Sequence, residues 1–249
     1  MPYFSYLQIN LGLVTLYTWG LFLGLAFFVC FFLFSKKAAK KNLTQEKIFW
    51  LAIFILSAGI VSARLFYVIQ FPYYLYHPLK ILEFSSGGLT IYGGLLGGLV
   101  AGWLYVKKSK LDFWQLADIL APIIALGIFI VRIGCFFTND HQGSITGLPW
   151  AIQWPDGELR HPVALYLSLN GLFMFWALLF LKDKLKRSGQ LFIIFLFYYS
   201  ISRFILDFFR SSDTLLSDPH YLNLTVSQWI STFTLLALVI FGKKLLAKK

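Results

Sequence analysis

The sequence predicts an all-α integral membrane protein with seven transmembrane helices. Of its 249 residues, 58% are hydrophobic and 13% are charged, about half the charged fraction usual for a soluble domain. Apolar runs of roughly 20 residues, long enough to cross a hydrocarbon core of about 30 Å, recur along the chain. Because backbone groups in lipid must be satisfied within the segment, these continuous runs are expected to be helices, not the short alternating segments of a β-barrel.

The predicted spans follow one another along the chain, with short connections on the cytoplasmic side. They are centred near residues 12–34, 47–69, 87–106, 115–137, 162–181, 190–209 and 224–242. The first run is too long for a cleavable signal peptide and lacks a basic start, so we expect it to be retained as a span. We expect residues 1–249 to form a single membrane domain. Its longer outer-face loops would lie near residues 70–86, 138–161 and 210–223.

The distribution of the basic residues, which give a net charge of +11, predicts the orientation. Lysine-rich clusters follow the first, third, fifth and seventh spans, at residues 36–41, 107–110, 182–187 and 243–249. By the positive-inside tendency these ends are cytoplasmic, which places the N-terminus outside and the C-terminus in the cytoplasm. We therefore interpret the basic balance as a topology signal with some attraction to anionic lipid headgroups, and we expect no nucleic-acid partner.

Charged side chains inside the spans are the first candidate functional residues, since each costs on the order of 2.5–3.5 kcal/mol on insertion scales. Arg64 and Arg132 lie near the outer ends of the second and fourth spans. One face of the sixth span carries Tyr199, Arg203, Asp207 and Arg210 at helical spacing. Two explanations stay open: internal salt bridges that hold the helices together, or a clamp for the phosphate of an anionic phospholipid. Arginine suits the clamp because its planar fork of donors matches phosphate.

A glycine-rich stretch, SSGGLTIYGGLLGG at 85–98, leads into the third span. It contains Gly93 and Gly94, and such glycines permit either close helix packing or the close approach of a ligand. Both alternatives stay open. Tyr92 lies inside this stretch, so its phenol is a candidate to project into any space the glycines leave.

The outer loops hold the remaining polar chemistry. RHPVALY at 160–166 places His161 before Pro162, which fits a helix with proline in its first turn. The alternative is an ordinary solvated loop histidine. Asp140 and His141 lie in the same loop. Cys30 and Cys135 are too few and too far apart to indicate a disulfide framework or a metal site, so we expect no metal.

Together these elements resemble the prolipoprotein diacylglyceryl transferases of bacterial plasma membranes, whose signature is Gly-Arg-x-Gly-Asn-Phe-x-Asn-x-Glu-x-x-Gly. The corresponding stretch here is VRIGCFFTNDHQG at 131–143. Four signature positions match: Arg132, Gly134, Phe136 and Gly143. Four differ: Val131 stands for a glycine, Cys135 and Thr138 for asparagines, and Asp140 for a glutamate.

The resemblance extends along most of the chain, in order. SARLFYV with Arg64 resembles the family's second helix, and the glycine-rich stretch resembles its third, with Tyr92 where many members have histidine. DFWQLADILAP, with Asp118, is similar to the run into the signature helix. The RHPVALY stretch resembles the family's Arg-His-Pro element, with Leu167 where a glutamate is common. SRFILDFFR, with Asp207 for a glutamate, and VSQW resemble the last two helices.

This resemblance implies transfer of the diacylglyceryl group of phosphatidylglycerol to the lipobox cysteine of preprolipoproteins, at the outer leaflet of the bacterial plasma membrane and without a cofactor. The reaction needs a thiolate and positive charge where the phosphate departs. The implied catalytic residues are Arg132, Arg203, Tyr92 and Asp140. The implied substrate-binding residues are Arg64, Gly93, Gly94, Gly134, Gly143, His161, Tyr199, Asp207, Arg210 and Gln228.

Several alternatives stay open at this point. The general base is unassigned, because a phenol with an ordinary pKa of ~10 makes Tyr92 a poor base, while His141 and His161 are candidates by chemistry alone. Cys135 is either an apolar filler or a covalent lipid carrier. The departures from the signature also allow a lipid-binding accessory paralogue without the activity. A transporter is the other rival, but the charges gather at one membrane face and no internal repeat is found.

Overall fold

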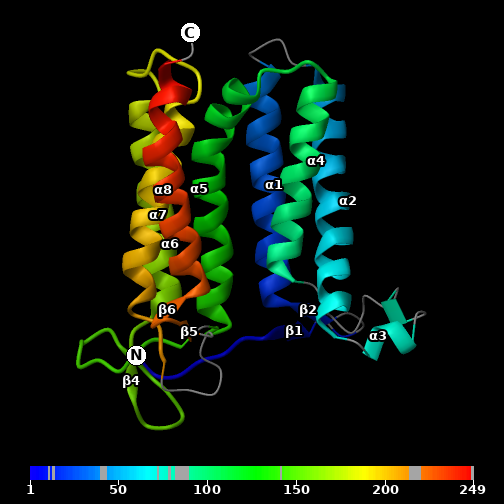
Figure 1. Cartoon of the computed structure of the whole chain (residues 1–249). Helices are drawn as coiled ribbons and strands as arrows, with labels where there is room; N and C mark the ends of the chain where they lie inside the picture. Colours follow the sequence, from blue (N-terminus) through cyan, green and yellow to red (C-terminus); the bar gives the residue numbers. More distant parts are fainter. Residues whose placement is uncertain are drawn as a thin grey trace. The chain divides into compact units, whose positions relative to one another are not determined.

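The computed structural model describes residues 1–10, 12, 15–39, 44–71, 73–77, 80–81, 90–140, 142–212 and 220–247. Within these ranges the chain is mainly helical (Figure 1). The long helices are α1 (Thr18–Ala39), α2 (Gln45–Gln70), α4 (Ile91–Lys108), α5 (Phe113–Phe137), α6 (Val163–Leu181), α7 (Gln190–Asp207) and α8 (Val226–Ala247). A single turn, α3 (Tyr73–Tyr76), follows α2.

Five of these helices, α1, α2, α5, α6 and α7, are long and apolar enough to cross a membrane. The sequence of α4 contains five glycines and two lysines, which dilute its apolar character. The apolar part of α8 is the shorter stretch Val226–Ile240. The helical membrane fold is therefore confirmed, while the count of seven spans and the orientation of the termini stay predictions.

The prediction for the start of the first span was wrong. Residues 15–17, included in that span, form strand β2 (Thr15–Tyr17), which pairs antiparallel with β1 (Gln8–Asn10), and the helix begins only at Thr18. Gly12 lies between the strands with φ +83°, a conformation that glycine adopts without strain. β-Branched and aromatic residues such as Thr15 and Tyr17 favour strands, and an apolar run alone does not distinguish the two structures.

Two further hairpins lie in or beside the predicted outer loops, and the second takes up residues 224–225 of the predicted seventh span, so that its helix begins only at Val226. Strands β3 (Ile152–Gln153) and β4 (Leu159–Arg160) pair in the first, and β5 (His220–Tyr221) and β6 (Leu224–Thr225) pair in the second. The turn of the second hairpin holds Leu222 and Asn223 at positive φ, as a two-residue hairpin turn requires. Helix α8 begins at Val226, directly after strand β6.

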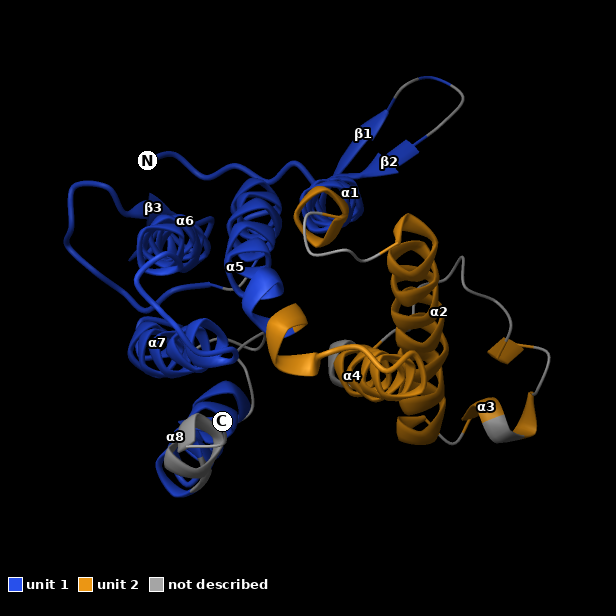
Figure 2. Ribbon diagram, turned by 90° about the horizontal axis from the view of Figure 1, so that it is seen from above, with its two compact units in different colours: residues 1–34, 117–249 blue, residues 35–116 orange. Residues whose placement is uncertain are grey.

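The residue contacts divide the chain into two compact units, residues 1–34 with 117–249 and residues 35–116 (Figure 2). In the larger unit, α5, α6 and α7 share a core. Its buried members are Ala121, Ala125, Met174, Leu178, Leu191 and Phe195. In the smaller unit α2 packs along α4. The prediction of a single domain stays a prediction.

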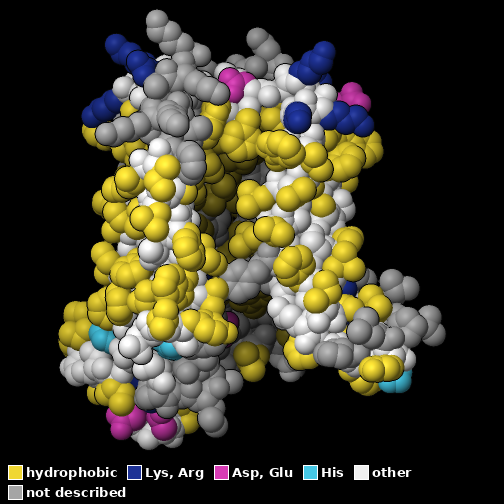
Figure 3. Space-filling view, in the orientation of Figure 1, with side chains coloured by type: hydrophobic (Ala, Val, Ile, Leu, Met, Phe, Trp, Pro, Cys, Tyr) yellow, Lys and Arg dark blue, Asp and Glu magenta, His cyan; other side chains and the backbone are white. Residues whose placement is uncertain are grey.

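Hydrophobic side chains also cover the outward faces of the helices in each unit (Figure 3). In the larger unit Phe173, Trp176 and Phe180 are each at least 60% exposed. Leu99 and Trp103 are exposed on α4 in the smaller unit. An apolar surface of this extent is unfavourable in water and suited to contact with lipid tails.

Candidate functional site

The last turn of α7 carries a buried charge cluster. The Asp207 carboxylate is fully buried and lies 3.0 Å from the Arg203 guanidinium, one turn earlier on the helix. Arg210, just past the helix end, lies 3.6 Å from the same carboxylate oxygen. Arg203, Asp207 and Arg210 therefore lie together, as their spacing predicted, and both arginines pair with the one carboxylate.

The start of α8 binds to this cluster through a capping box, in which the side chains of Thr225 and Gln228 satisfy each other's backbone N–H groups. The Thr225 N–H donates to Gln228 Oε1 at 2.9 Å, and the Gln228 N–H donates to Thr225 Oγ1 at 3.1 Å. The Thr225 hydroxyl also donates to the Asp207 carboxylate, and Gln228 Nε2 donates to the Phe204 carbonyl at 3.3 Å. Both ends of the Gln228 amide are thus engaged with the protein.

Arg203 keeps a donor uncommitted. Its Nη2 donates to Ser227 Oγ at 2.9 Å and faces Asp207. Its Nη1 is buried without a hydrogen-bond partner among the residues that the structure describes. A buried donor left unpaired costs about 1–3 kcal/mol, more for a charged group, so this nitrogen is a natural contact for an acceptor brought by a ligand.

Arg132 extends the positive charge from a second helix. It lies on α5, is half-buried, and donates from Nη1 to Cys135 Sγ at 3.7 Å. Arg132, Tyr199, Asp207 and Arg210 all lie within electrostatic range of the Arg203 guanidinium. Two arginines therefore pair with the Asp207 carboxylate and a third lies near Arg203, which leaves a formal surplus of two positive charges. The ion pairs expected under the salt-bridge alternative are thus present, and the phosphate clamp stays a prediction.

The signature loop is fastened to the end of α7 by backbone pairing. Gly143 and Arg210 form an antiparallel bridge, the Ser144 N–H donates to Phe209 O at 2.8 Å, and the Ser211 N–H donates to Gln142 O at 2.9 Å. These bonds join segments more than 60 residues apart in the chain. The loop that follows Arg132 and the turn that holds Arg210 are therefore one structural element.

Gly143 is needed at this junction because of close contact. A Cβ atom added there would meet the His161 carbonyl oxygen and lie 2.8 Å from the His161 Cβ. The Arg160 guanidinium donates to the Gly143 carbonyl at 3.2 Å and to Asp156 at 3.1 Å. Gly143 is therefore fixed from two sides by the Arg-His-Pro segment.

His161 lies in an aromatic corner formed with Tyr166 and Phe209. Its Nδ1 is 3.1 Å from the Tyr166 hydroxyl, and its ring packs edge-on against Phe209 with centroids 5.0 Å apart. The Trp150 N–H also donates to the Tyr166 hydroxyl, at 2.8 Å. Burial lowers the pKa of the His161 imidazole below its ordinary value of 6.5, because desolvation disfavours the charged form.

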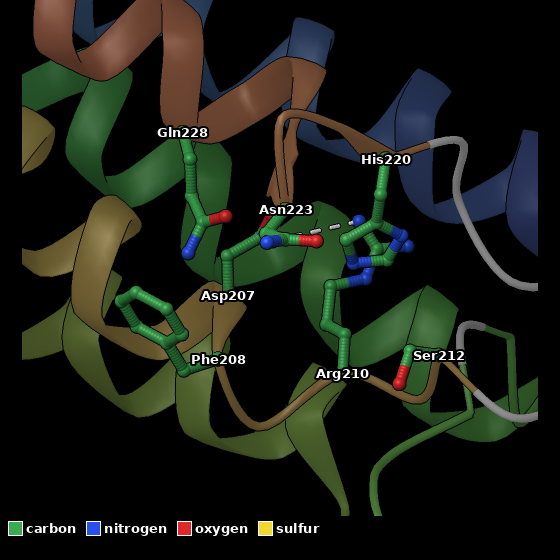
Figure 4. Close-up of a pocket in the computed structure, with 7 residues that line it drawn as sticks. All are labelled: Asp207, Phe208, Arg210, Ser212, His220, Asn223 and Gln228. Carbon is green, nitrogen blue, oxygen red and sulfur yellow. Dashed lines mark ion pairs between the residues drawn. The ribbon is translucent and has the colours of Figure 1, made fainter.

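A cavity of about 480 Å³ opens beside the charge cluster (Figure 4). It is lined by Asp207, Phe208, Arg210, Ser212, His220, Asn223 and Gln228. Arg210 and His220 reach into it from opposite walls, from the end of α7 and from the β5–β6 hairpin. Its polar lining and its place next to Arg203 make it the candidate site for a charged headgroup.

The remaining predicted residues of the larger unit surround this region. Tyr199 stacks on Phe195 one turn before Arg203, with ring centroids 5.9 Å apart. Gly134 is buried, and a Cβ there would lie 2.6 Å from the Phe22 Cβ, so it permits α1 and α5 to pack. Asp140 is exposed just past α5, with its N–H donating to the Cys135 carbonyl. Its predicted catalytic role stays a prediction.

Four predicted residues lie in the smaller unit. Arg64 is buried, donates to the carbonyls of Ile81 and Lys80 at 2.9 and 2.7 Å, and stacks over Tyr74. A Cβ on Gly93 would lie 2.6 Å from the Ser62 carbonyl oxygen, and Gly94 lies against Ala63. Of the two open alternatives for these glycines, close helix packing is therefore confirmed. Their role toward a ligand stays a prediction.

The structure does not describe two of the predicted side chains. Tyr92 lies in α4, but its side chain is outside the described residues, as is His141. The roles expected for both side chains therefore stay predictions.

Comparison with known proteins decides the family. The family model described as prolipoprotein diacylglyceryl transferase matches residues 7–242. A phosphatidylglycerol–prolipoprotein diacylglyceryl transferase of Geobacillus kaustophilus is 35% identical over 221 residues, 84% of this chain and 82% of the relative. A protein of that name from Thermosynechococcus vestitus is 33% identical, over 85% and 83%. One from Bacillus cytotoxicus is 32% identical, over 97% and 92%.

The chain belongs to the prolipoprotein diacylglyceryl transferase family. The resemblance found from the sequence is thereby confirmed, and the departures in the signature occur within a true member. One is readily accommodated: the Thr138 hydroxyl is buried and donates to the helix carbonyls of Gly134 and Cys135. Cys135 is 2% exposed, as expected for a small apolar filler.

The charge network and the cavity wall of this diacylglyceryl transferase family member also contain residues that were not predicted from its sequence. They are Thr225 and Ser227 in the charge network and Phe208, Ser212, His220 and Asn223 in the cavity wall. One signal was present: TVSQ at 225–228 fits the capping-box pattern. The cavity wall had no such signal, because its members come from three separate segments.

Proposed function

We propose that this chain transfers the diacylglyceryl group of phosphatidylglycerol to the lipobox cysteine of preprolipoproteins. Membership in the diacylglyceryl transferase family supports the reaction and both substrates. We further propose that the protein crosses the bacterial plasma membrane seven times, with its N-terminus outside and its C-terminus in the cytoplasm. The charge cluster would then face the outer leaflet, since the lysine clusters mark the cytoplasmic ends.

The transfer is a displacement at carbon. The cysteine sulfur, as thiolate, attacks the glyceryl carbon that is bonded to the phosphate oxygen, and a C–S bond forms. The C–O bond breaks, and glycerol phosphate departs with the electron pair. The thiol proton passes to a base, so that atoms and charge balance, and no oxidant or cofactor enters the step.

The arginine cluster suits this reaction because of how the charge changes. A phosphodiester carries one negative charge, whereas the departing phosphate monoester carries between 1.5 and 2. The surplus positive charge around Arg132, Arg203 and Arg210 therefore stabilises the transition state more than the bound lipid, which is the condition for a faster chemical step. Asp207 neutralises part of the cluster and fixes the direction of the Arg203 guanidinium.

The buried and uncommitted Nη1 of Arg203 is the observation that carries the proposal. A phosphate oxygen would satisfy this donor and remove the penalty of its burial. Arg132 would contact the same phosphate from α5. The cavity beside Arg210 would hold the glycerol headgroup, with the Gln228 end of the network as its wall.

A proton acceptor is available beside this phosphate position. His220 lines the cavity, and an imidazole is the side chain best suited to accept a proton near neutral pH. His161 is not among the residues that line this cavity; its ring packs against Tyr166 and Phe209 instead. Tyr92 would donate a hydrogen bond to the substrate.

The test is direct detection of the product. Purified protein in nanodiscs that contain phosphatidylglycerol is incubated with a lipobox peptide, and the cysteine is examined by mass spectrometry for the diacylglyceryl adduct. We expect an adduct from the wild type, reduced at least a hundredfold in Arg132→Ala and Arg203→Ala, the scale at which loss of one transition-state contact acts. Lys184→Ala, on an exposed lysine past α6, is the matched control for loss of a positive charge.

Two results would contradict this account. A folded wild type that binds the lipid and forms no adduct would favour the accessory lipid-binding paralogue. Full activity in Arg132→Ala and Arg203→Ala would remove the phosphate clamp while leaving the family's reaction in place.

A further inference from the structure

We infer that Asp118 is a positioning residue for the transfer, because it sets the register between α5 and α7 and so holds Arg132 level with Arg203. This inference rests on the proposed function for its effect on rate. Asp118 itself lies near the start of α5, at the opposite end of the helix from Arg132, so it does not contact the reacting groups.

Asp118 caps the start of α7 from the neighbouring helix. Its Oδ2 accepts the Gly189 N–H at 2.7 Å, and its Oδ1 accepts the Phe192 N–H at 2.9 Å. Gly189 is the N-cap residue of α7, at φ +89°, and it has no side chain with which to cap its own helix. A side-chain oxygen normally fills this role from the N-cap position. Here it comes from 71 residues away.

The position of Asp118 sets the height of both arginines. Arg132 is 14 residues beyond Asp118 on α5 (132 − 118), and Arg203 is 14 residues beyond Gly189 on α7 (203 − 189). At 1.5 Å per residue both distances are about 21 Å. Asp118 and Gly189 meet at the starts of the two helices, and Arg132 and Arg203 lie within electrostatic range of each other near the ends. The helices therefore run parallel. Because the two spacings are equal, the hydrogen bonds of Asp118 place the two guanidinium groups at the same level.

The packing between the Asp118 hydrogen bonds and the arginines does not fix this register as strongly. The core between these levels contains Ala121 and Ala125 of α5 and Leu191 and Phe195 of α7, together with Met174 and Leu178 of α6. Small alanine side chains offer little interlocking against a sliding helix, in contrast to a carboxylate with two directed hydrogen bonds at the positive end of a helix dipole. Loss of Asp118 should therefore let α7 shift along its axis.

A shift of α7 along its axis should change the rate of the chemical step more than the affinity for the peptide. Displacement of catalytic groups by about 1 Å can lower the rate about a hundredfold. We expect Asp118→Ala to lower kcat by about this factor with the KM for the lipobox peptide unchanged. Asp118→Asn keeps one carbonyl oxygen as acceptor and should be intermediate.

Asp112 provides the matched control. Its Oδ1 accepts the N–H groups of Trp114 and Gln115 at 2.9 and 3.2 Å, so it also caps a helix start through two hydrogen bonds. It caps its own helix, however, and does not connect α5 with α7. Asp112→Ala should therefore leave kcat at the wild-type value, whereas a general loss of helix capping would affect both variants alike.

A distance measurement tests the register without reference to activity. Nitroxide labels on Phe137 and Ile205, both exposed near the ends of α5 and α7, are placed in a background with Cys30 and Cys135 replaced by serine. Pulsed electron resonance in nanodiscs should give a shifted or broadened distance for Asp118→Ala and Asp118→Asn, and a wild-type distance for Asp112→Ala. If the wild type forms no adduct, the proposed function fails and this distance alone decides the inference.

The inference is overturned if both Asp118 variants keep the wild-type kcat, or if both keep the wild-type distance. Should Asp118→Ala not fold, Asp118→Asn supplies both measurements. A higher peptide KM at unchanged kcat would likewise overturn it, because it would place the effect in binding.

Discussion

The carboxylate of Asp207 lies 3.0 Å from the guanidinium of Arg203, and its side chain has no exposed surface. A buried ion pair of this kind is expensive to break, because the remaining charge is left without a partner. We expect Asp207→Asn to destabilise the folded state by about 3 kcal/mol and to lower the rate of transfer. Thermal unfolding in lipid and the adduct assay measure the two effects, and unchanged values of both would show that Asp207 does not organise the arginines.

Gly143 offers a test of the junction between the signature loop and α7. Gly143→Ala places a methyl group against the backbone of His161, so the loop must move away from Arg210 and activity should fall at least tenfold, on the scale of misplaced catalytic groups. Gly147→Ala in the same loop meets nothing within 4 Å and is the control. Equal activity of the two variants in the adduct assay would contradict the prediction.

The capping box at the start of α8 predicts that substitution of Thr225 costs more stability than substitution of Thr234 in the same helix region. Thr225→Val removes the acceptor for the Gln228 N–H and the donor to Asp207, and it should cost about 1–2 kcal/mol with a fall in activity. Thr234→Val removes only a hydroxyl bonded to the Ile230 carbonyl within its own helix, so it should be close to neutral. Unfolding temperatures in nanodiscs compare the pair, and an equal loss for both would assign no special role to the box.

The environment of His161 predicts a dependence on pH. Burial lowers the pKa of His161 in the folded protein, so the unfolded chain binds a proton more readily than the folded chain does. Its contribution to stability is therefore complete above the ordinary value of 6.5 and is lost as the pH falls below it. The unfolding temperature should decline from about pH 6.5 downward, and His161→Gln should reduce this acid-side decline. A decline of the same size in the variant would assign it to other groups.

The sequence was a good guide where a signal is local. Apolar runs predicted the long helices, and the spacing of Arg203, Asp207 and Arg210 predicted a shared face that the structure contains. The start of the first span was wrong because apolar character is common to helix and strand, and residues 15–17 pair with residues 8–10 instead.

Contacts between distant segments could not be predicted in this way. The carboxylate of Asp118 reaches Gly189 across 71 positions of the chain, and Gly143 is fixed by the backbone of His161. Neither pairing leaves a periodic or compositional trace in one sequence. The cavity beside Arg210 has the same origin, because its lining residues come from α7, the β5–β6 hairpin and α8.

The uncommitted nitrogen of Arg203 has a practical consequence for handling the protein. A ligand that binds only the folded state raises its stability in proportion to the logarithm of its concentration, and a phosphate oxygen on this nitrogen would be such a ligand. Extraction into a detergent that removes anionic lipid would remove this stabilisation. The Arg203 Nη1 would then be buried without a hydrogen-bond acceptor. The delipidated preparation is then the short-lived form, and phosphatidylglycerol serves the enzyme as a stabiliser during purification as well as a substrate.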